Sequence, residues 1–184
     1  SGTSVRSTYK DDKLHGLWSS SNFNGGESGN YKNGKLDGKW TEYGVGISNG
    51  PVYDIEGNYK DGKKDGKWTF WDGYKKVYKE KEGNYKDDKK DGKWTTWYKN
   101  GQKKEEYNYK DGIPDGEWTS WFGNGLQSGK GIFKDGTGTF LQLDGNNQKS
   151  FGLIYEDGTG THTEWFENGQ IASEKNYRDG TTLV

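Results

Sequence analysis

A ten-residue phrase that recurs along the chain constrains its fold more than any other feature. The phrase begins at Tyr59 as YKDGKKDGKW, and it returns at Tyr85 as YKDDKKDGKW and at Tyr109 as YKDGIPDGEW. A fixed short period is typical of architectures in which stacked neighbours, rather than single units, bury the apolar surface. Fainter copies extend the series in both directions, with anchor aromatics at Tyr9, Tyr31, Tyr59, Tyr85, Tyr109, Phe133, Tyr155 and Tyr177.

Each central copy has the pattern of a strand, a turn and a second strand. Residues 93–98 are rich in aromatic and β-branched side chains, Asn100-Gly101 follows, and residues 103–110 lead to the next anchor. Asn-Gly is the preferred pair for hairpin turns that need positive φ at both central residues. The Asp-Gly-x-x-Asp-Gly segment at 61–66 is expected to supply two further sharp bends.

The sequence therefore predicts an all-β fold, a single elongated antiparallel meander of tandem β-hairpin repeats that forms a twisted single-layer sheet. The anchor spacings of 22 to 28 residues are all even, which keeps the same side chains on the same face. The array is expected to span 1–184, with about eight anchors over 9–180 and the best-matching copies at 59–129. Residues 1–4 could be a remnant of cloning, and the lack of an initiating Met suggests a trimmed fragment.

Composition explains what holds such a fold together and argues against several functions. Only 27% of residues are apolar, but nine Trp and thirteen Tyr can bury roughly 150–250 Å² each. Lys and Arg number 27 against 28 Asp and Glu, so no overall charge favours nucleic acid. The absence of Cys excludes disulfides and thiolate metal sites, and no apolar run is long enough for a transmembrane segment. We expect no cofactor.

Two aromatic series lie three positions apart in successive repeats, which places them on opposite faces of the predicted strands. We interpret the first aromatic series as structural and the second as a candidate binding face. The alternative, that both series only hold a thin fold together, stays open. The first aromatic series comprises Trp40, Trp68, Trp94 and Trp118; the second comprises Tyr43, Trp71, Trp97, Trp121 and Trp165.

Charged residues in the loops offer weaker candidates. Lys63, Lys64, Lys89 and Lys90 could form a basic edge for phosphates or anionic lipid headgroups, but interleaved aspartates favour a solvated edge. Turn chemistry also explains those aspartates better than calcium binding, because their spacing fits no common calcium loop. The two histidines, His15 and His162, each stand alone without a catalytic phrase, so no catalytic residue and no metal site is predicted.

The stretches at 57–71, 83–101 and 108–125 resemble the bacterial MORN-like repeats, in the variant with Gly-x-Tyr-Lys-Asp-Gly followed by Asp-Gly-Lys-Trp-Thr and an Asn-Gly turn. Proteins built from this variant are often described as YwqK-type antitoxins. The resemblance implies an antiparallel meander that serves as an interaction module or scaffold. It carries no catalytic residues to transfer to this chain.

These observations lead to a non-enzymatic repeat scaffold that presents an aromatic-rich β surface to a protein partner, in the manner of an antitoxin or an adhesin. The first alternative is a module that binds carbohydrate or another cell-envelope ligand through stacked Trp and Tyr. Lipid headgroup binding through the lysine edge is the second alternative. The sequence does not fix the compartment, although its composition favours the bacterial cell surface or periplasm slightly, and it leaves the oligomeric state open.

Overall fold

The structure is a computed structural model of the 184-residue chain, and its described residues form strands joined by turns. The described part contains no helix, and therefore none long and apolar enough to cross a membrane. The prediction of an all-β meander of antiparallel hairpins is confirmed. The structure describes residues 4–22, 25–44, 53–73, 76–144, 146, 149–156, 159–165, 168, 170–178 and 181–183.

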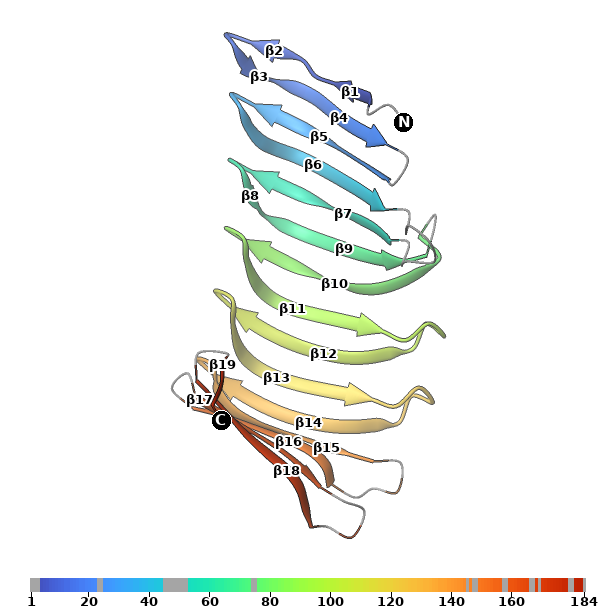
Figure 1. The fold of residues 1–184 in the computed structure, drawn as a ribbon, viewed down its shortest axis with the longest axis vertical. Helices are drawn as coiled ribbons and strands as arrows, with labels where there is room; N and C mark the ends of the chain where they lie inside the picture. The colour runs from blue at the N-terminus through green and yellow to red at the C-terminus, as the bar shows by residue number, and fades with distance from the viewer. Residues whose placement is uncertain are drawn as a thin grey trace. The chain divides into compact units, whose positions relative to one another are not determined.

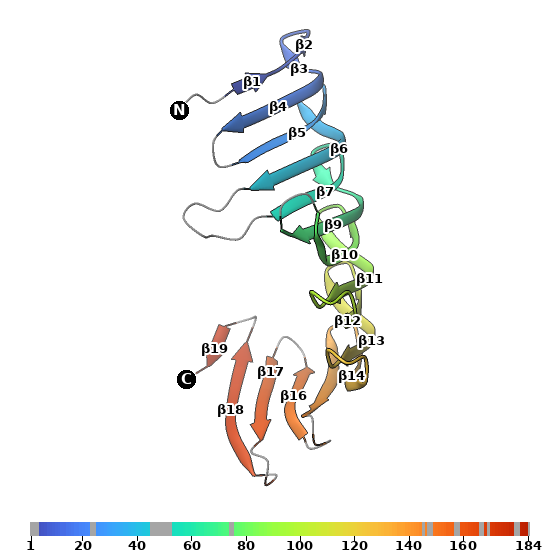
Figure 2. The ribbon, with the colours of Figure 1, turned by 90° about the vertical axis from the view of Figure 1, so that its right-hand side faces the viewer.

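The chain divides into two compact units, Ser1–Asp91 and Gly92–Val184, which we call the N-terminal and the C-terminal unit. Within each unit, strands that follow one another in the sequence lie side by side, as Figure 1 and Figure 2 show. Such sequential pairing is the shortest way to connect antiparallel strands, because each connection needs only a tight turn.

In the N-terminal unit the meander starts with β1 against β4, while β2 and β3 form a small hairpin of their own. From β4 to β7 each strand pairs with the next, β7 then pairs with both β8 and β9, and β9 pairs with β10. The strands are β1 (Ser4–Arg6), β2 (Tyr9–Lys10), β3 (Lys13–Leu14), β4 (Gly16–Asn22), β5 (Gly25–Lys32), β6 (Lys35–Gly44), β7 (Tyr53–Lys60), β8 (Lys63–Lys64), β9 (Gly66–Asp72) and β10 (Tyr78–Lys86).

The division between the units falls within β11 (Lys89–Trp97). From β11 onward each strand of the C-terminal unit pairs antiparallel with the one that follows it. These strands are β12 (Lys103–Lys110), β13 (Ile113–Trp121), β14 (Gln127–Lys134), β15 (Thr137–Leu143), β16 (Lys149–Glu156), β17 (Thr159–Trp165), β18 (Ile171–Arg178) and β19 (Thr181–Leu183).

The two kinds of turn differ from the expectation for Asn-Gly. Positive φ at two successive residues occurs in the Asp-Gly turns, as at Asp61 (φ 51°) and Gly62 (φ 90°). In the Asn100-Gly101 turn only the glycine has positive φ (82°). Its amide donates to the carbonyl of Tyr98 (2.9 Å), and the Asn100 side chain accepts from the amide of Gln102 (3.1 Å). This is a type I turn closed by a glycine bulge, and the side-chain acceptor explains why Asn stands there.

The tips of successive hairpins are joined by a second, regular set of backbone hydrogen bonds. The amide of Gly62 donates to the carbonyl of Leu36 (2.7 Å), and that of Asp88 donates to the carbonyl of Lys64 (3.0 Å). In the C-terminal unit Gly136 donates to Pro114 in the same way (2.9 Å). In these pairs the later tip satisfies a backbone carbonyl of the tip before it, which orders the loops that carry the Asp-Gly phrases.

Candidate functional site

One face of the sheet, which we call the first face, alternates large and small residues from strand to strand. In the N-terminal unit Trp40 of β6 pairs with Gly29 on one side and Gly57 on the other, and Trp68 of β9 pairs with Gly83. A Cβ atom built on Gly57 would overlap the indole of Trp68. The missing side chain thus lets the indole lie flat on the neighbouring backbone, and Trp68 is only 1% exposed.

Tyrosine rings close the remaining sides of these indoles. Trp68 meets the edges of Tyr59 (centroids 5.2 Å apart) and Tyr85 (5.9 Å) at interplanar angles of 87° and 83°. Its Nε1 donates to the carbonyl of Asn58 (3.1 Å), so the polar atom of the ring is satisfied. Edge-to-face contact of this kind places the positive rim of one ring against the negative face of the next. The repeated anchor tyrosine is therefore a packing partner of the repeated tryptophan.

The structure places the first aromatic series on this packed face. Trp40 is 7% exposed and Trp94 is 1% exposed, while Trp118 is half-buried between Tyr107 and Phe133. In the C-terminal unit this alternation is interrupted at Tyr107, which pairs with both Trp94 and Trp118, and it resumes at Gly131, which pairs with Trp118. Trp40, Trp68 and Trp94 are therefore covered by the sheet itself, whereas Trp118 keeps part of its ring exposed.

The lysine side chains of the predicted basic edge point in different directions in the structure. The Lys64 ammonium lies 4.3 Å from the centroid of the Trp68 ring and 5.2 Å from that of Tyr85, so it covers the packed face. Lys63 instead forms an ion pair with Asp87 (3.4 Å). Lys90 is half-buried, and burial, together with the nearby Lys81 charge, lowers the pKa of its ammonium; Lys89 is exposed. Consecutive lysines of a strand point to opposite sides, which prevents one continuous basic stripe.

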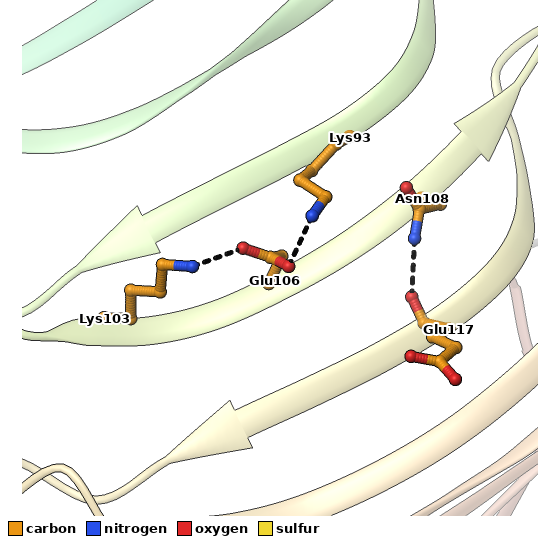
Figure 3. A network of polar contacts seen from close by, with 5 residues as sticks. All are labelled: Lys93, Lys103, Glu106, Asn108 and Glu117. Carbon is orange, nitrogen blue, oxygen red and sulfur yellow. Dashed lines mark hydrogen bonds and ion pairs between the residues drawn. The ribbon is translucent and has the colours of Figure 1, made fainter.

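The opposite, second face carries a repeated arrangement of one glutamate between two lysines. In the C-terminal unit Glu106 accepts hydrogen bonds from Lys93 and Lys103, both at 2.7 Å, as Figure 3 shows. In the N-terminal unit Glu82 lies 3.1 Å from Lys67 and 3.0 Å from Lys79. Figure 3 also shows Asn108 donating to the backbone carbonyl of Glu117 (3.1 Å), a contact between neighbouring strands that does not involve a charge.

These ion pairs set the protonation of the second face. Burial alone would raise the pKa of the Glu106 carboxyl, but hydrogen bonds and charge from Lys103 and Lys93 outweigh it and lower the pKa below its ordinary value. The same balance, with Lys79 and Lys67, lowers the pKa of Glu82. Both carboxylates are therefore ionised at neutral pH and fully engaged within the sheet.

The second aromatic series lies on this face, next to charged side chains of the neighbouring strands. Tyr43 is 42% exposed, and Trp71, Trp97 and Trp121 are half-buried. Trp165 belongs to β17, but its side chain lies outside the described residues. The binding role of the series stays a prediction. Its cross-strand partners differ between copies: Tyr43 and Trp71 both pair with Asp54, Trp97 pairs with Lys103, and Trp121 pairs with Gln127.

Lysine ammonium groups lie over several of these rings. The Nζ atoms of Lys76 and Lys79 are 5.9 and 5.8 Å from the Trp71 ring centroid, and Lys103 is 5.7 Å from that of Trp121. Such cation–π contacts attract the ammonium to the face of the ring. Trp71 and Trp121 are therefore bordered by positive charge rather than by open solvent alone.

A hollow of about 600 Å³ lies in the N-terminal unit and was not predicted from the sequence. Its apolar part comes from Tyr53 and Ile55 of β7 and Phe70 of β9, and Ile55 pairs directly with Phe70. Phe70 lies two positions after Trp68 and Ile55 two before Gly57, so both side chains belong to the first face. The residues that line the hollow are Glu42, Tyr53, Ile55, Phe70, Trp71, Asp72, Glu80 and Lys81.

Comparison with the other repeats shows why this hollow is apolar. The position of Phe70 is occupied by Glu42, Thr96 and Ser120 in neighbouring copies. In the C-terminal unit the corresponding cross-strand pairs are Thr96 with Glu105 and Glu105 with Ser120, which are polar. Departure from the repeat pattern was thus the signal that could have identified the site, because an apolar pair replaces a polar one where nothing in the repeat requires it.

A smaller, polar depression of about 220 Å³ adjoins the hollow and shares Glu42 and Tyr53 with it. Glu42 pairs across the strands with Glu27 and accepts a hydrogen bond from the Tyr53 hydroxyl (3.1 Å). Burial, together with the Glu42 charge, raises the pKa of the Glu27 carboxyl. The same surroundings raise the pKa of the Tyr53 hydroxyl, with burial as the largest cause. The field at this end of the first face is therefore negative.

The two histidines of the chain belong to different units. His162 is half-buried, and its Nε2 lies 3.4 Å from Glu164 Oε1, while Glu164 also accepts from the Ser173 hydroxyl (2.8 Å). His15 lies far from it in sequence, in the other unit. Among the described residues no group of three or more His, Asp or Glu side chains is arranged to hold a metal ion.

Comparison with protein families agrees with this architecture. Residues 90–111 and 155–179 match the profile of the MORN repeat variant. The second match lies beyond the copies at 59–129 that resemble the repeat best by inspection. The two matches and the repeated hairpins support a MORN-like repeat protein that serves as a scaffold or binding module. No curated protein sequence matches the chain.

Proposed function

We propose that the protein is a non-enzymatic module that binds a protein partner through the second aromatic series. The observation that carries the proposal is the repetition of half-exposed aromatics at one position of the repeat, at Tyr43, Trp71, Trp97 and Trp121. Tyr and Trp dominate the energetics of protein interfaces, particularly where polar groups surround them. A glutamate held between two lysines borders these rings in both units and supplies such a polar surround.

The contacts of the rings favour a protein partner over a carbohydrate. A sugar stacks on the open face of an aromatic ring, but lysine ammonium groups lie over Trp71 and Trp121. A protein partner can displace a lysine and offer it a carboxylate in exchange, whereas a neutral glycan cannot. Lipid headgroup binding is disfavoured in the same way, because Lys63 is paired with Asp87 and Lys64 lies over Trp68. An antitoxin or an adhesin would be a specific form of the proposed function.

The proposal can be tested with Trp97→Ala and Trp121→Ala, singly and together, in the full 184-residue chain. We expect a random peptide-display library selected on the wild-type protein to give sequences whose binding falls about tenfold or more in the double variant, since central aromatic anchors dominate interface energies. Glu117→Gln, on the same face away from both rings, is the matched control and should bind as the wild type does.

A glycan array screened with the same proteins provides the opposing outcome. Glycan binding by the wild-type chain that is lost in Trp97→Ala would replace the proposal with the carbohydrate alternative. Selected peptides that bind the double variant as well as the wild type would show that the second aromatic series is not the interface.

A further inference from the structure

The hollow at Ile55 and Phe70 carries a further inference; Trp71 of the second aromatic series contributes to its lining, but Trp97 and Trp121 do not. Its volume of about 600 Å³ falls within the range of 300–1,000 Å³ that is usual for binding sites. An aromatic and aliphatic floor with a few charged groups at its border is the usual composition of such sites. The chain places Ile55 and Phe70 here against the pattern of its own repeats, in which this cross-strand pair is polar.

The charges around the hollow define what it can accept. Glu42, Asp72 and Glu80 contribute three carboxylates to the border, and Lys81 contributes one ammonium. Glu27, which pairs with Glu42 across the strands, adds to the negative side. An anionic ligand would therefore meet repulsion, and a cationic ligand would meet complementary charge around an apolar floor.

The chain itself shows how a cation sits on this floor. The Lys81 ammonium lies 4.9 Å from the centroid of the Phe70 ring. It also forms an ion pair with Glu80, at 3.6 Å from Oε1. A flexible lysine of this kind can move aside, because its ion pair with Glu80 is exposed and individually weak. An arginine side chain suits the position better than a second lysine, since its planar guanidinium stacks on rings and also forms paired hydrogen bonds with carboxylates.

We propose that this hollow is a docking site for an arginine-containing, basic segment of a partner protein, with the guanidinium over Phe70 and its donors directed to Glu42 or Asp72. Aliphatic neighbours of the arginine would occupy the side formed by Tyr53 and Ile55. The site belongs entirely to the N-terminal unit, whereas Trp97 and Trp121 belong to the C-terminal unit. It can therefore be tested independently of the proposed function.

The test uses the isotope-labelled full chain and two peptides, acetyl-Arg-Leu-Arg-Leu-amide and acetyl-Glu-Leu-Glu-Leu-amide, titrated while backbone amide shifts are recorded. We expect the basic peptide to shift the amides of Ile55, Phe70 and Lys81 and to bind at least about tenfold more tightly than the acidic peptide. Added salt should lower the affinity for the basic peptide, because the carboxylates at the border of the hollow are partly exposed and salt screens their charge.

Substitutions that copy the other repeats keep the test independent of folding failure. Phe70→Thr reproduces Thr96, which the same fold accommodates. It should lower the affinity for the basic peptide by about fivefold or more, since it removes the ring under the cation. Glu42→Gln should lower the affinity for the basic peptide by about threefold. Lys81→Gln should raise this affinity, because it removes the competing ammonium. Trp97→Ala is the control and should leave the affinity unchanged.

Three results would overturn the proposal. Equal affinity for the two peptides would show that charge does not select the occupant. Unchanged affinity of Phe70→Thr, or shifts confined to other parts of the chain, would place the binding elsewhere. A concentration-dependent dimer in sedimentation that disappears in Phe70→Thr would show that a second copy of this chain occupies the hollow.

Discussion

The two faces of β9 place the same residue type in opposite situations. Trp68 on the first face is 1% exposed, whereas Trp71, three residues later on the second face, is half-buried. The neighbours of Trp68 across the strands are glycines, so the indole lies on the backbone between two tyrosine rings. The neighbours of Trp71 are Asp54 and Lys79. The difference shows that in a single-layer sheet the adjacent strand decides whether an aromatic residue is core or surface.

The test with the largest expected effect on stability removes one indole from each face. Trp68→Ala should lower the free energy of unfolding by about 4 kcal/mol, as expected for a fully buried aromatic that leaves a cavity. Trp71→Ala should cost about 1 kcal/mol, because its ring is partly solvated already. Urea denaturation followed by circular dichroism measures both values. Equal losses in the two variants would contradict the division into a packed and an open face.

The second test fills the space on which an indole lies. Gly57→Ala should lower the free energy of unfolding by about 2–3 kcal/mol, because the added methyl overlaps the Trp68 ring and forces it from its position. Gly123→Ala is the matched control. A Cβ atom there would meet only the Asn100 amide nitrogen, at 4.0 Å, so near-wild-type stability is expected. A stable Gly57→Ala protein would show that glycine is not what permits the close approach.

The third test asks whether a lysine is part of the cover of the packed face. Lys64→Gln should lower the free energy of unfolding by about 1 kcal/mol, since it removes a cation from over the Trp68 ring. Lys63→Gln removes only an exposed ion pair with Asp87 and should change stability by less than about 0.5 kcal/mol. Comparable effects of the two substitutions would mean that the Lys64 contact contributes nothing specific.

The smallest effect concerns the ion pairs of the second face. Glu106→Gln should cost about 0.5 kcal/mol at pH 7, the size of a partly exposed ion pair. The pKa of Glu106 is lower in the folded chain than its unfolded value of about 4.3, so this stabilisation is present above that pH and is lost as the pH falls through the folded value. Denaturation curves of wild type and variant should therefore converge at acidic pH.

A matched control separates this effect from general acid destabilisation. Glu117→Gln alters a carboxylate that is 66% exposed, and its difference from wild type should be near zero at every pH. A Glu106→Gln difference that stays constant down to the most acidic pH at which both proteins remain folded would show that the two lysines do not hold the carboxylate.

Much of the fold could be read from particular residues. The return of the Tyr59 phrase at Tyr85 and Tyr109 predicted antiparallel hairpins, and the structure has them. The turn geometry was harder to predict from the sequence, because Asn-Gly and Asp-Gly are both preferred in turns with positive φ at both central residues. Only the structure shows that Asp61-Gly62 has the two positive φ values, while Asn100 uses its side chain to accept a hydrogen bond.

The candidate site was harder to predict than the fold. Sequence reasoning selected aromatics that recur, and recurrence is a sign of shared packing as much as of shared function. Phe70 and Ile55 do not recur, so a search for regular positions passed over them. They become a site only because β7 and β9 pair in a register that places them side by side.

The sequence by itself determined the period, the strands, and the alternation that separates the two aromatic series, since these depend on local geometry within each hairpin. The tertiary structure alone decided which side chain each ring would meet on the next strand. Glycine under Trp68, lysine over Trp71 and isoleucine beside Phe70 are products of strand register. Register joins residues that are distant along the chain, and no local pattern specifies what such residues bury together.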